Sequence, residues 1–281
     1  MRTAFIGLGN IGAPMAHRLA AAAPQTIVHD AVSAAMTGFE GVATLASSPA
    51  AVGEMAELVG VCVRDDADIR AVVDGQQGLL RTMRTGIIAV HSTVRPSTVV
   101  DLAARAADHG VSVIDVAVSG GADGAAKGTL TGLAGGDAAL IAKARPMLDT
   151  YCSDIIHAGE TGSGMALKLC NNLVTYIELS AALEAYRLAE ALDLDPDMLT
   201  GVMTNNGNLT PAMRQYIAFR RTGPAQIGGE AFMATQKALI ALGSKDLELA
   251  GEAAAETGTT IEVTTHVRAH FERIVMEGLQ S

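Results

Sequence analysis

The spacing of apolar and polar positions changes near residue 157. Before that point, short apolar runs alternate with Ala-rich amphipathic stretches, which predicts a mainly parallel sheet with helices on both faces. Strands are expected at Thr3–Ile6, Thr26–His29, Leu58–Val63, Ile87–His91, Val111–Val116, Thr131–Gly135 and Ser153–His157. The helices expected between them include Pro14–Ala23, Ile69–Val73, Ser97–His109 and Ala138–Thr150.

Beyond His157 the pattern is helical. A stretch from about Gly162 to Ala191 carries an apolar residue every three or four positions. Those residues are Met165, Leu169, Leu173, Tyr176, Leu179, Leu183 and Tyr186. We therefore predict a Rossmann-type α/β domain over residues 1–160 and an all-α domain over 161–281, joined by this long helix. A helix of this length favours contact with a second subunit, so we expect a homodimer or homotetramer.

A glycine-rich loop follows the first expected strand. It consists of Gly7, Leu8, Gly9, Asn10, Ile11 and Gly12. In this G-x-G-x-x-G spacing the first glycine permits a tight turn, the second lets a pyrophosphate approach and the third lets the next helix pack closely. The phosphates would lie at the helix N-terminus. The loop therefore predicts a dinucleotide site.

An acidic residue, Asp30, ends the second expected strand, 18 residues after Gly12. A carboxylate at this position meets the adenosine ribose hydroxyls and repels a 2′-phosphate. No arginine occurs in the following segment, Ala31–Met36. We therefore expect NAD as the cofactor, with NADP less favoured.

Lys168 and Asn172 are spaced i, i+4, so on a helix they share one face. A lysine held against a buried surface loses its proton more easily than in water and can act as an acid or base at an alcohol or carbonyl. The amide could fix the substrate oxygen. An ordinary surface pair of lysine and asparagine is the alternative.

Two further segments could bind an anion. Asp115–Gly121 runs from a strand into a Ser-Gly-Gly loop, whose consecutive N–H groups could hold a carboxylate. A simple turn is the alternative. Gly243–Ala250 is interpreted as a helix start with Lys245 in its first turn. The helix dipole disfavours a cation there, which indicates an anionic partner, although a surface pair with Asp246 would also explain it.

The composition narrows the class of protein. A net charge of −10 argues against nucleic acid or an anionic membrane surface as a partner. No apolar run is long enough to span a membrane, so we expect a soluble, cytoplasmic protein. Cys62, Cys152 and Cys170 lack C-x-x-C spacing and are expected to be reduced, buried thiols. His266 and His270 have no acidic cluster nearby, so no metal site is predicted.

Five segments together resemble the β-hydroxyacid dehydrogenase family. They are Gly7–Met15, Ser92–Val94, Asp115–Leu130, Gly162–Asn172 and Lys245–Ala250, in the family's order. The glycine motif is shared with many dehydrogenases, whereas the Ser-Gly-Gly and K-x-x-N-N segments are much more specific. The resemblance implies a Rossmann-type domain, an all-helical domain and an active site in the cleft between them.

The resemblance also implies a role for each matched residue. Lys168 would be the catalytic acid/base and Asn172 would orient the substrate oxygen. The substrate carboxylate would be held by Ser119, Gly120 and Gly121. Thr93 would lie near the nicotinamide ribose, and Lys245 would close over cofactor and substrate, with Asp246 supporting its helix.

Some positions depart from the family pattern. Val63 and Arg64 follow a strand at the edge expected to face the nicotinamide, and Arg95 adds a cation near the loop of Thr93. Each arginine is more simply interpreted as a surface residue. Upstream of Lys245, Gly228–Gln236 does not match the usual phenylalanine spacing. That region helps to shape the substrate pocket, so the identity of the acid stays open.

The favoured function is an NAD-dependent oxidoreductase that interconverts a small 3-hydroxy acid, such as 3-hydroxyisobutyrate, with its semialdehyde or keto acid. An imine or other carbonyl reductase of the same fold is the alternative, but such relatives usually lack the lysine found at Lys168. A non-catalytic dinucleotide-binding module is less favoured, because Lys168 and Asn172 are both present.

Overall fold

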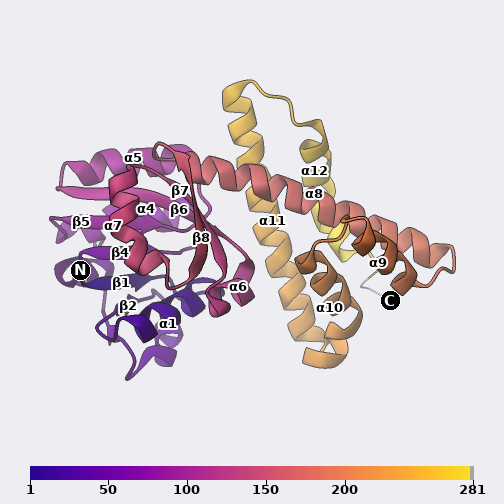
Figure 1. The fold of residues 1–281 in the computed structure, drawn as a ribbon, viewed down its shortest axis with the longest axis horizontal. Helices are drawn as coiled ribbons and strands as arrows, with labels where there is room; N and C mark the ends of the chain where they lie inside the picture. Colours follow the sequence, from indigo (N-terminus) through magenta and orange to yellow (C-terminus); the bar gives the residue numbers. More distant parts are fainter. Residues whose placement is uncertain (279–281) are drawn as a thin grey trace. The chain divides into compact units, whose positions relative to one another are not determined.

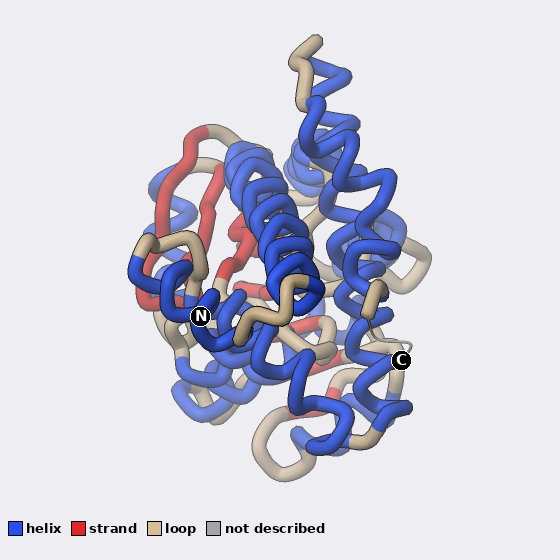
Figure 2. Tube along the Cα trace, turned by 90° about the vertical axis from the view of Figure 1, so that its right-hand side faces the viewer, coloured by secondary structure: helices blue, strands red, loops and turns tan. Residues whose placement is uncertain are grey.

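The computed structural model describes residues 1–278. The chain divides into two compact units, Met1–Lys168 and Leu169–Ser281. In the first unit a sheet is covered by helices, and in the second the described elements are helices only (Figures 1 and 2). A domain boundary near residue 160 stays a prediction from the sequence.

The first unit contains one eight-stranded sheet in the order β3-β2-β1-β4-β5-β6-β7-β8. Its strands are β1 (Thr3–Ile6), β2 (Ile27–His29), β3 (Thr44–Leu45), β4 (Leu58–Val61), β5 (Gly86–Val90), β6 (Val111–Ser119), β7 (Leu130–Gly135) and β8 (Cys152–Gly159). Neighbours are parallel except β6 and β7, which pair antiparallel. All seven expected strands are present. The sequence missed β3, which has only two residues, both exposed, and so lacks an apolar pattern.

Alternate side chains of the central strands enter different apolar clusters, as the two-residue period requires. In β5, Ile88 and Val90 join a cluster with residues of α3, α4 and α5. Ile87 and Ala89 join a second cluster with residues of α1, α6 and α7. The helical segments of this unit are α1 (Gly12–Ala22), α2 (Ser33–Met36), η1 (Thr37–Phe39), α3 (Pro49–Met55), α4 (Asp66–Asp74), η2 (Leu79–Arg81), α5 (Pro96–Ala107), α6 (Gly121–Lys127) and α7 (Ala138–Leu148).

The strand register aligns the ends of the central strands. Ile6 pairs with Val61, Val61 with Val90, and Val90 with Asp115. The loops after β1, β4 and β5 therefore leave the sheet at the same edge. The strand order reverses beside β1, and ligands of open α/β sheets bind at such a point, outside the carboxyl ends of the strands.

A buried histidine lies directly after β5. The Nδ1 atom of His91 is 2.8 Å from the Val116 carbonyl oxygen, and its Nε2 atom is 3.0 Å from the Tyr151 hydroxyl. A carbonyl only accepts, so Nδ1 carries the hydrogen and the Tyr151 hydroxyl donates to Nε2. Burial lowers the pKa of His91 to about 4, which keeps the ring neutral.

The second unit is built around α8 (Ser163–Ala191), which begins in the first unit. Its further helices are α9 (Pro196–Asn205), α10 (Pro211–Ile227), α11 (Gly229–Thr257) and α12 (Glu262–Met276). Tyr176 and Leu183 of α8 pack in one cluster with Leu247 of α11 and Phe271 of α12. The predicted apolar stripe is therefore confirmed as the buried face of α8. Within the described residues, no helix is long and apolar enough to cross a bilayer.

Two expectations for this unit are wrong. Cys170 is exposed, because it lies outside the buried stripe of α8, whereas Cys152 is buried as expected. Lys245 lies well inside α11, which continues through Gly243 rather than starting there. A Cβ atom on Gly243 would lie 2.3 Å from Cε1 of Phe271, so this glycine permits close packing and does not mark a helix end. The dipole argument for an anion at Lys245 therefore no longer applies.

Candidate active site

The three glycines after β1 differ in their surroundings. Gly7 has φ +94°, and a Cβ there would lie 2.1 Å from the Cys62 carbonyl oxygen. A Cβ on Gly12 would lie 2.0 Å from the Gly7 carbonyl oxygen, so helix α1 packs directly on the turn. At Gly9 no described atom comes within 4 Å of a built Cβ. Packing thus explains two of the glycines, and the open side of the third fits a pyrophosphate.

Asp30 organises the same loop. Its Oδ2 atom accepts the Leu8 N–H at 2.6 Å and its Oδ1 atom accepts the Val32 N–H at 2.7 Å. Each carboxylate oxygen has a second lone pair, so hydroxyl groups of a ribose could still bind there. Asn10 is exposed and Ile11 half-buried just before α1. The chemistry of this loop fits a dinucleotide.

The loops after β4 and β5 are joined by hydrogen bonds that the sequence did not reveal. The Ser92 Oγ atom accepts the Val63 N–H at 2.7 Å. The Asp66 Oδ1 atom accepts the Thr98 hydroxyl at 2.6 Å and the Arg95 N–H at 3.1 Å. These bonds fix both loops at the edge of the sheet. A polar residue directly after a buried strand is the only sequence signal that could have indicated them.

The two unassigned arginines form ion pairs. Arg64, whose side chain is 85% exposed, lies 2.8 Å from the carboxylate of Asp68, and this hydrogen bond lowers the pKa of Asp68. Arg95 lies 3.1 Å from the carboxylate of Asp66. Thr93, two residues before Arg95, is half-buried. The interpretation of Arg64 as a surface residue is confirmed, and Arg95 stabilises the start of α5.

The Ser-Gly-Gly segment is partly strand and partly helix. Ser119 is the last residue of β6, and α6 begins at Gly121. Gly120 and Gly121 have φ +128° and +65°, values that residues with a side chain rarely adopt. Glycine is therefore required by the backbone here. Binding of a substrate carboxylate by this segment stays a prediction.

Lys168 lies in the first turns of α8, whose start is bound to a buried carboxylate. Asp115 is 0% exposed; its Oδ1 atom accepts the Gly162 N–H at 2.7 Å and its Oδ2 atom the Met165 N–H at 2.8 Å. Lys168 follows three residues later and is only 8% exposed. The prediction of a lysine on a buried surface is confirmed. The role of Asp115 was not visible in the sequence, where it only preceded the Ser-Gly-Gly loop.

In the second unit Asn172 belongs to a side-chain network. It is 8% exposed, and its Nδ2 atom donates to Oδ2 of Asp246 at 2.6 Å. The Tyr176 hydroxyl donates to the same oxygen at 3.3 Å, and Lys245 Nζ lies 3.6 Å from Oδ1. Burial and the nearby Asp246 charge raise the pKa of Tyr176, so the phenol keeps its proton. The carboxylate therefore fixes which end of the Asn172 amide faces it.

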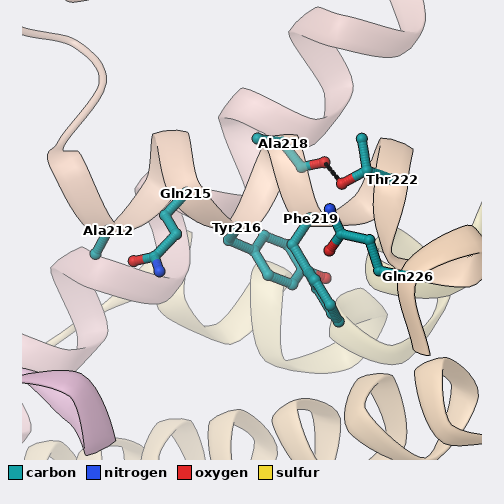
Figure 3. A pocket seen from close by; sticks show the side chains of 7 residues that line it. All are labelled: Ala212, Gln215, Tyr216, Ala218, Phe219, Thr222 and Gln226. Carbon is teal, nitrogen blue, oxygen red and sulfur yellow. Dashed lines mark hydrogen bonds between the residues drawn. The ribbon is translucent and has the colours of Figure 1, made fainter.

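A cavity of about 460 Å³ lies along α10, between Ala212 and Gln226 (Figure 3). Its lining includes the rings of Tyr216 and Phe219. None of the predicted site residues contributes to it. This cavity therefore does not mark the candidate active site.

These features define a dinucleotide-binding α/β protein with a helical second part. Residues 2–159 match the family model of the NAD-binding domain of 6-phosphogluconate dehydrogenase. Residues 162–281 match the model described as NAD-binding of NADP-dependent 3-hydroxyisobutyrate dehydrogenase. The chain belongs to the β-hydroxyacid dehydrogenase family, as the motifs predicted.

Individual relatives agree with this assignment. A probable 3-hydroxyisobutyrate dehydrogenase of Mycobacterium tuberculosis is 34% identical, over 94% of this chain and 88% of the relative. An NAD-dependent L-serine dehydrogenase of Pseudomonas aeruginosa is 31% identical, over 98% and 92%. The solved structure of M. tuberculosis 3-hydroxyisobutyrate dehydrogenase with L-serine matches with a TM-score of 0.79 at 30% identity, covering 100% of both chains.

Proposed function

We propose that this protein is an NAD-dependent dehydrogenase of small 3-hydroxy acids, with Lys168 as its general acid/base. The carrying observation is that Lys168, at only 8% exposure, is followed one helical turn later by the equally buried Asn172. Buried amines exchange protons more readily near neutral pH than exposed ones do. Family membership and the glycine loop support the cofactor part of the proposal.

Lys168 carries out the proton transfers. Oxidation of the alcohol removes a hydride from carbon and a proton from oxygen, and NAD when bound supplies the hydride acceptor. Lys168 Nζ, in its neutral form, takes the hydroxyl proton as the C–O bond becomes a carbonyl. In the reverse direction its ammonium form returns that proton.

The Asn172 amide and the Ser-Gly-Gly segment orient the substrate. One N–H of Asn172 is engaged by Asp246, so its second N–H is available for the substrate oxygen. Ser119, Gly120 and Gly121 offer a hydroxyl and backbone N–H groups to the carboxylate. Lys245 adds a cation for the same anion or for the cofactor. Such positioning accounts for a large part of enzymatic rate enhancement.

The preference for NAD over NADP rests on Asp30. A cofactor bound with its adenosine ribose at the Asp30 carboxylate would have any 2′-phosphate repelled by that charge. The hydrogen bonds to the N–H groups of Leu8 and Val32 fix it in place.

The test is the initial rate of nicotinamide reduction with a panel of acids and with NAD and NADP. The panel contains 3-hydroxyisobutyrate, 3-hydroxypropionate, glycerate and 4-hydroxybutyrate, together with L-serine, after which one relative is named. We expect turnover of at least one 3-hydroxy acid with NAD. Lys168→Ala should lower kcat by roughly a hundredfold to ten-thousandfold, since general acid–base catalysis contributes about 10²–10⁴.

Lys143→Ala is the matched control, because Lys143 is an exposed lysine of α7 and should leave kcat unchanged. Full activity in Lys168→Ala would overturn the assigned mechanism. NADH binding without turnover of any hydroxy acid, but with reduction of a cyclic imine, would instead support the alternative of an imine reductase.

A further inference from the structure

Asp115 is a charged residue inside the apolar core of the first unit. It is level with Val90 in the sheet and lies two residues from Val113 and from Ala117, which belong to one apolar cluster. Met165 of α8 is buried in that cluster as well. The strand thus presents a carboxylate to the beginning of α8, within an otherwise apolar layer.

Both oxygens of Asp115 act as hydrogen-bond acceptors. They accept the N–H groups of Gly162 and Met165, whose amides have no partner in the preceding turn of a helix. Burial raises the pKa of Asp115, and these two N–H groups oppose that rise. A negative charge is also favoured at the positive end of a helix dipole. An asparagine would offer only one acceptor oxygen and would direct N–H toward N–H at the other position.

Two glycines make room for this carboxylate. A Cβ on Gly135 of β7 would lie 2.5 Å from Oδ1 of Asp115, and a Cβ on Gly164 of α8 would lie 2.8 Å from Oδ2. At Gly135 the carboxylate is the nearest group to such a Cβ, whereas at Gly164 the Leu133 carbonyl oxygen is nearer still, at 2.3 Å. The start of α8 is therefore fixed at Asp115 by close packing as well as by hydrogen bonds.

We propose that Asp115 is a positioning residue, whose carboxylate holds the first turn of α8 on β6 and β7 and thereby sets where the amine of Lys168 lies. Lys168 is four residues beyond Gly164, one helical turn along the same face. Because a helix is stiff over one turn, a shift of its anchored end moves the lysine. The role assigned to the lysine rests on the proposed function, whereas the anchoring of α8 does not.

The test combines kinetics with chemical labelling of lysines in the full chain. In Asp115→Asn we expect kcat for the hydroxy acid to fall by about tenfold to a hundredfold, with the Kd for NADH unchanged. Acetic anhydride should label Lys168 faster in this variant, as followed by peptide mass spectrometry, while labelling of Lys143 stays constant. Labelling needs no substrate, so it separates failure of this proposal from failure of the proposed function.

Asp137→Asn is the matched control. Asp137 likewise accepts two backbone N–H groups, from Ala139 and Leu140, at the start of α7 in the same unit. It should leave both kcat and the labelling of Lys168 unchanged. If Asp115→Asn behaves like Asp137→Asn, the proposal is wrong.

A second variant covers the case in which Asp115→Asn does not fold. Gly135→Ala keeps the carboxylate but displaces it, because the new methyl group would meet Oδ1. Faster labelling of Lys168 in this variant supports the proposal, and wild-type labelling overturns it.

Discussion

The carboxylates of the candidate site are held in different ways in the two units. In the first unit the carboxylates of Asp30 and Asp115 accept backbone N–H groups. In the second unit Asp246 accepts the side chains of Asn172 and Tyr176. A backbone donor exists whatever the residue, except proline, whereas a side-chain donor exists only with the right residue.

This difference decides what each network tolerates. A carboxylate held by backbone N–H groups depends on its own identity and on the path of the chain. The network of the second unit depends on both partners, because loss of one leaves the other buried and unsatisfied, at a cost of about 1–3 kcal/mol. The carboxylates of the first unit therefore need no particular donor side chain, although Asp115 needs glycine at Gly135 and Gly164. In the second unit, Asp246 and its side-chain donors can change only together.

The largest expected effect concerns a buried side-chain bond of the first unit, between His91 and Tyr151. The folded pKa of His91 is about 4, and an unfolded histidine has about 6.5. Between these values the unfolded chain binds the extra proton, so stability falls as pH drops from about 6.5 to 4. The loss attributable to His91 is about 3 kcal/mol at 1.36 kcal/mol per pKa unit.

Urea denaturation from pH 7 to pH 4 measures this loss, with His91→Gln as the reference that cannot titrate there. Other carboxyl groups titrate in both proteins, so only the difference between the two curves counts. Parallel curves would show that His91 does not control acid stability.

A somewhat smaller effect is expected when a backbone-held carboxylate is removed. Asp30→Ala loses the bonds to the N–H groups of Leu8 and Val32 and the proposed ribose contact. Hydrogen bonds to charged groups contribute about 1.5–3 kcal/mol each, so NADH should bind roughly tenfold to a hundredfold more weakly. NADPH should be affected less, which fluorescence titration with both cofactors measures. Asp101→Ala, which removes an exposed partner of Arg70, is the control and should bind NADH normally.

The smallest effect is expected in the second unit. Asp246→Asn loses the charge that accepts from Asn172 and Tyr176, and we expect kcat to fall about tenfold, the loss of about 1.4 kcal/mol. Binding of NADH should not change. Exchanging the pair, with Asn172→Asp and Asp246→Asn together, should recover thermal stability but not kcat. If both thermal stability and kcat recover, the pairing of residues 172 and 246 is sufficient for activity, and the second N–H of the Asn172 amide is not needed.

The fold was largely predictable because its strands are apolar runs bounded by turns. The glycine loop and Asp30 follow from local spacing, and the buried stripe of α8 follows from its period. The partners of Asp115 and Asp246 were not predictable, since they lie 47 and 74 residues away in the chain. Gly243 was misinterpreted because a glycine that precedes a helix and one that admits an aromatic ring inside a helix look the same in sequence.

The alignment of Asp115 with the ends of neighbouring strands also limits how this lineage can change in length. Successive strand residues face opposite sides of the sheet, so deleting one residue from the first half of β6 would turn Asp115 toward α1, α6 and α7. Val116, an apolar residue, would then take the place of Asp115 and face the start of α8. Substitutions can accumulate along this strand one at a time, but insertions and deletions should be confined to the loops on either side of it.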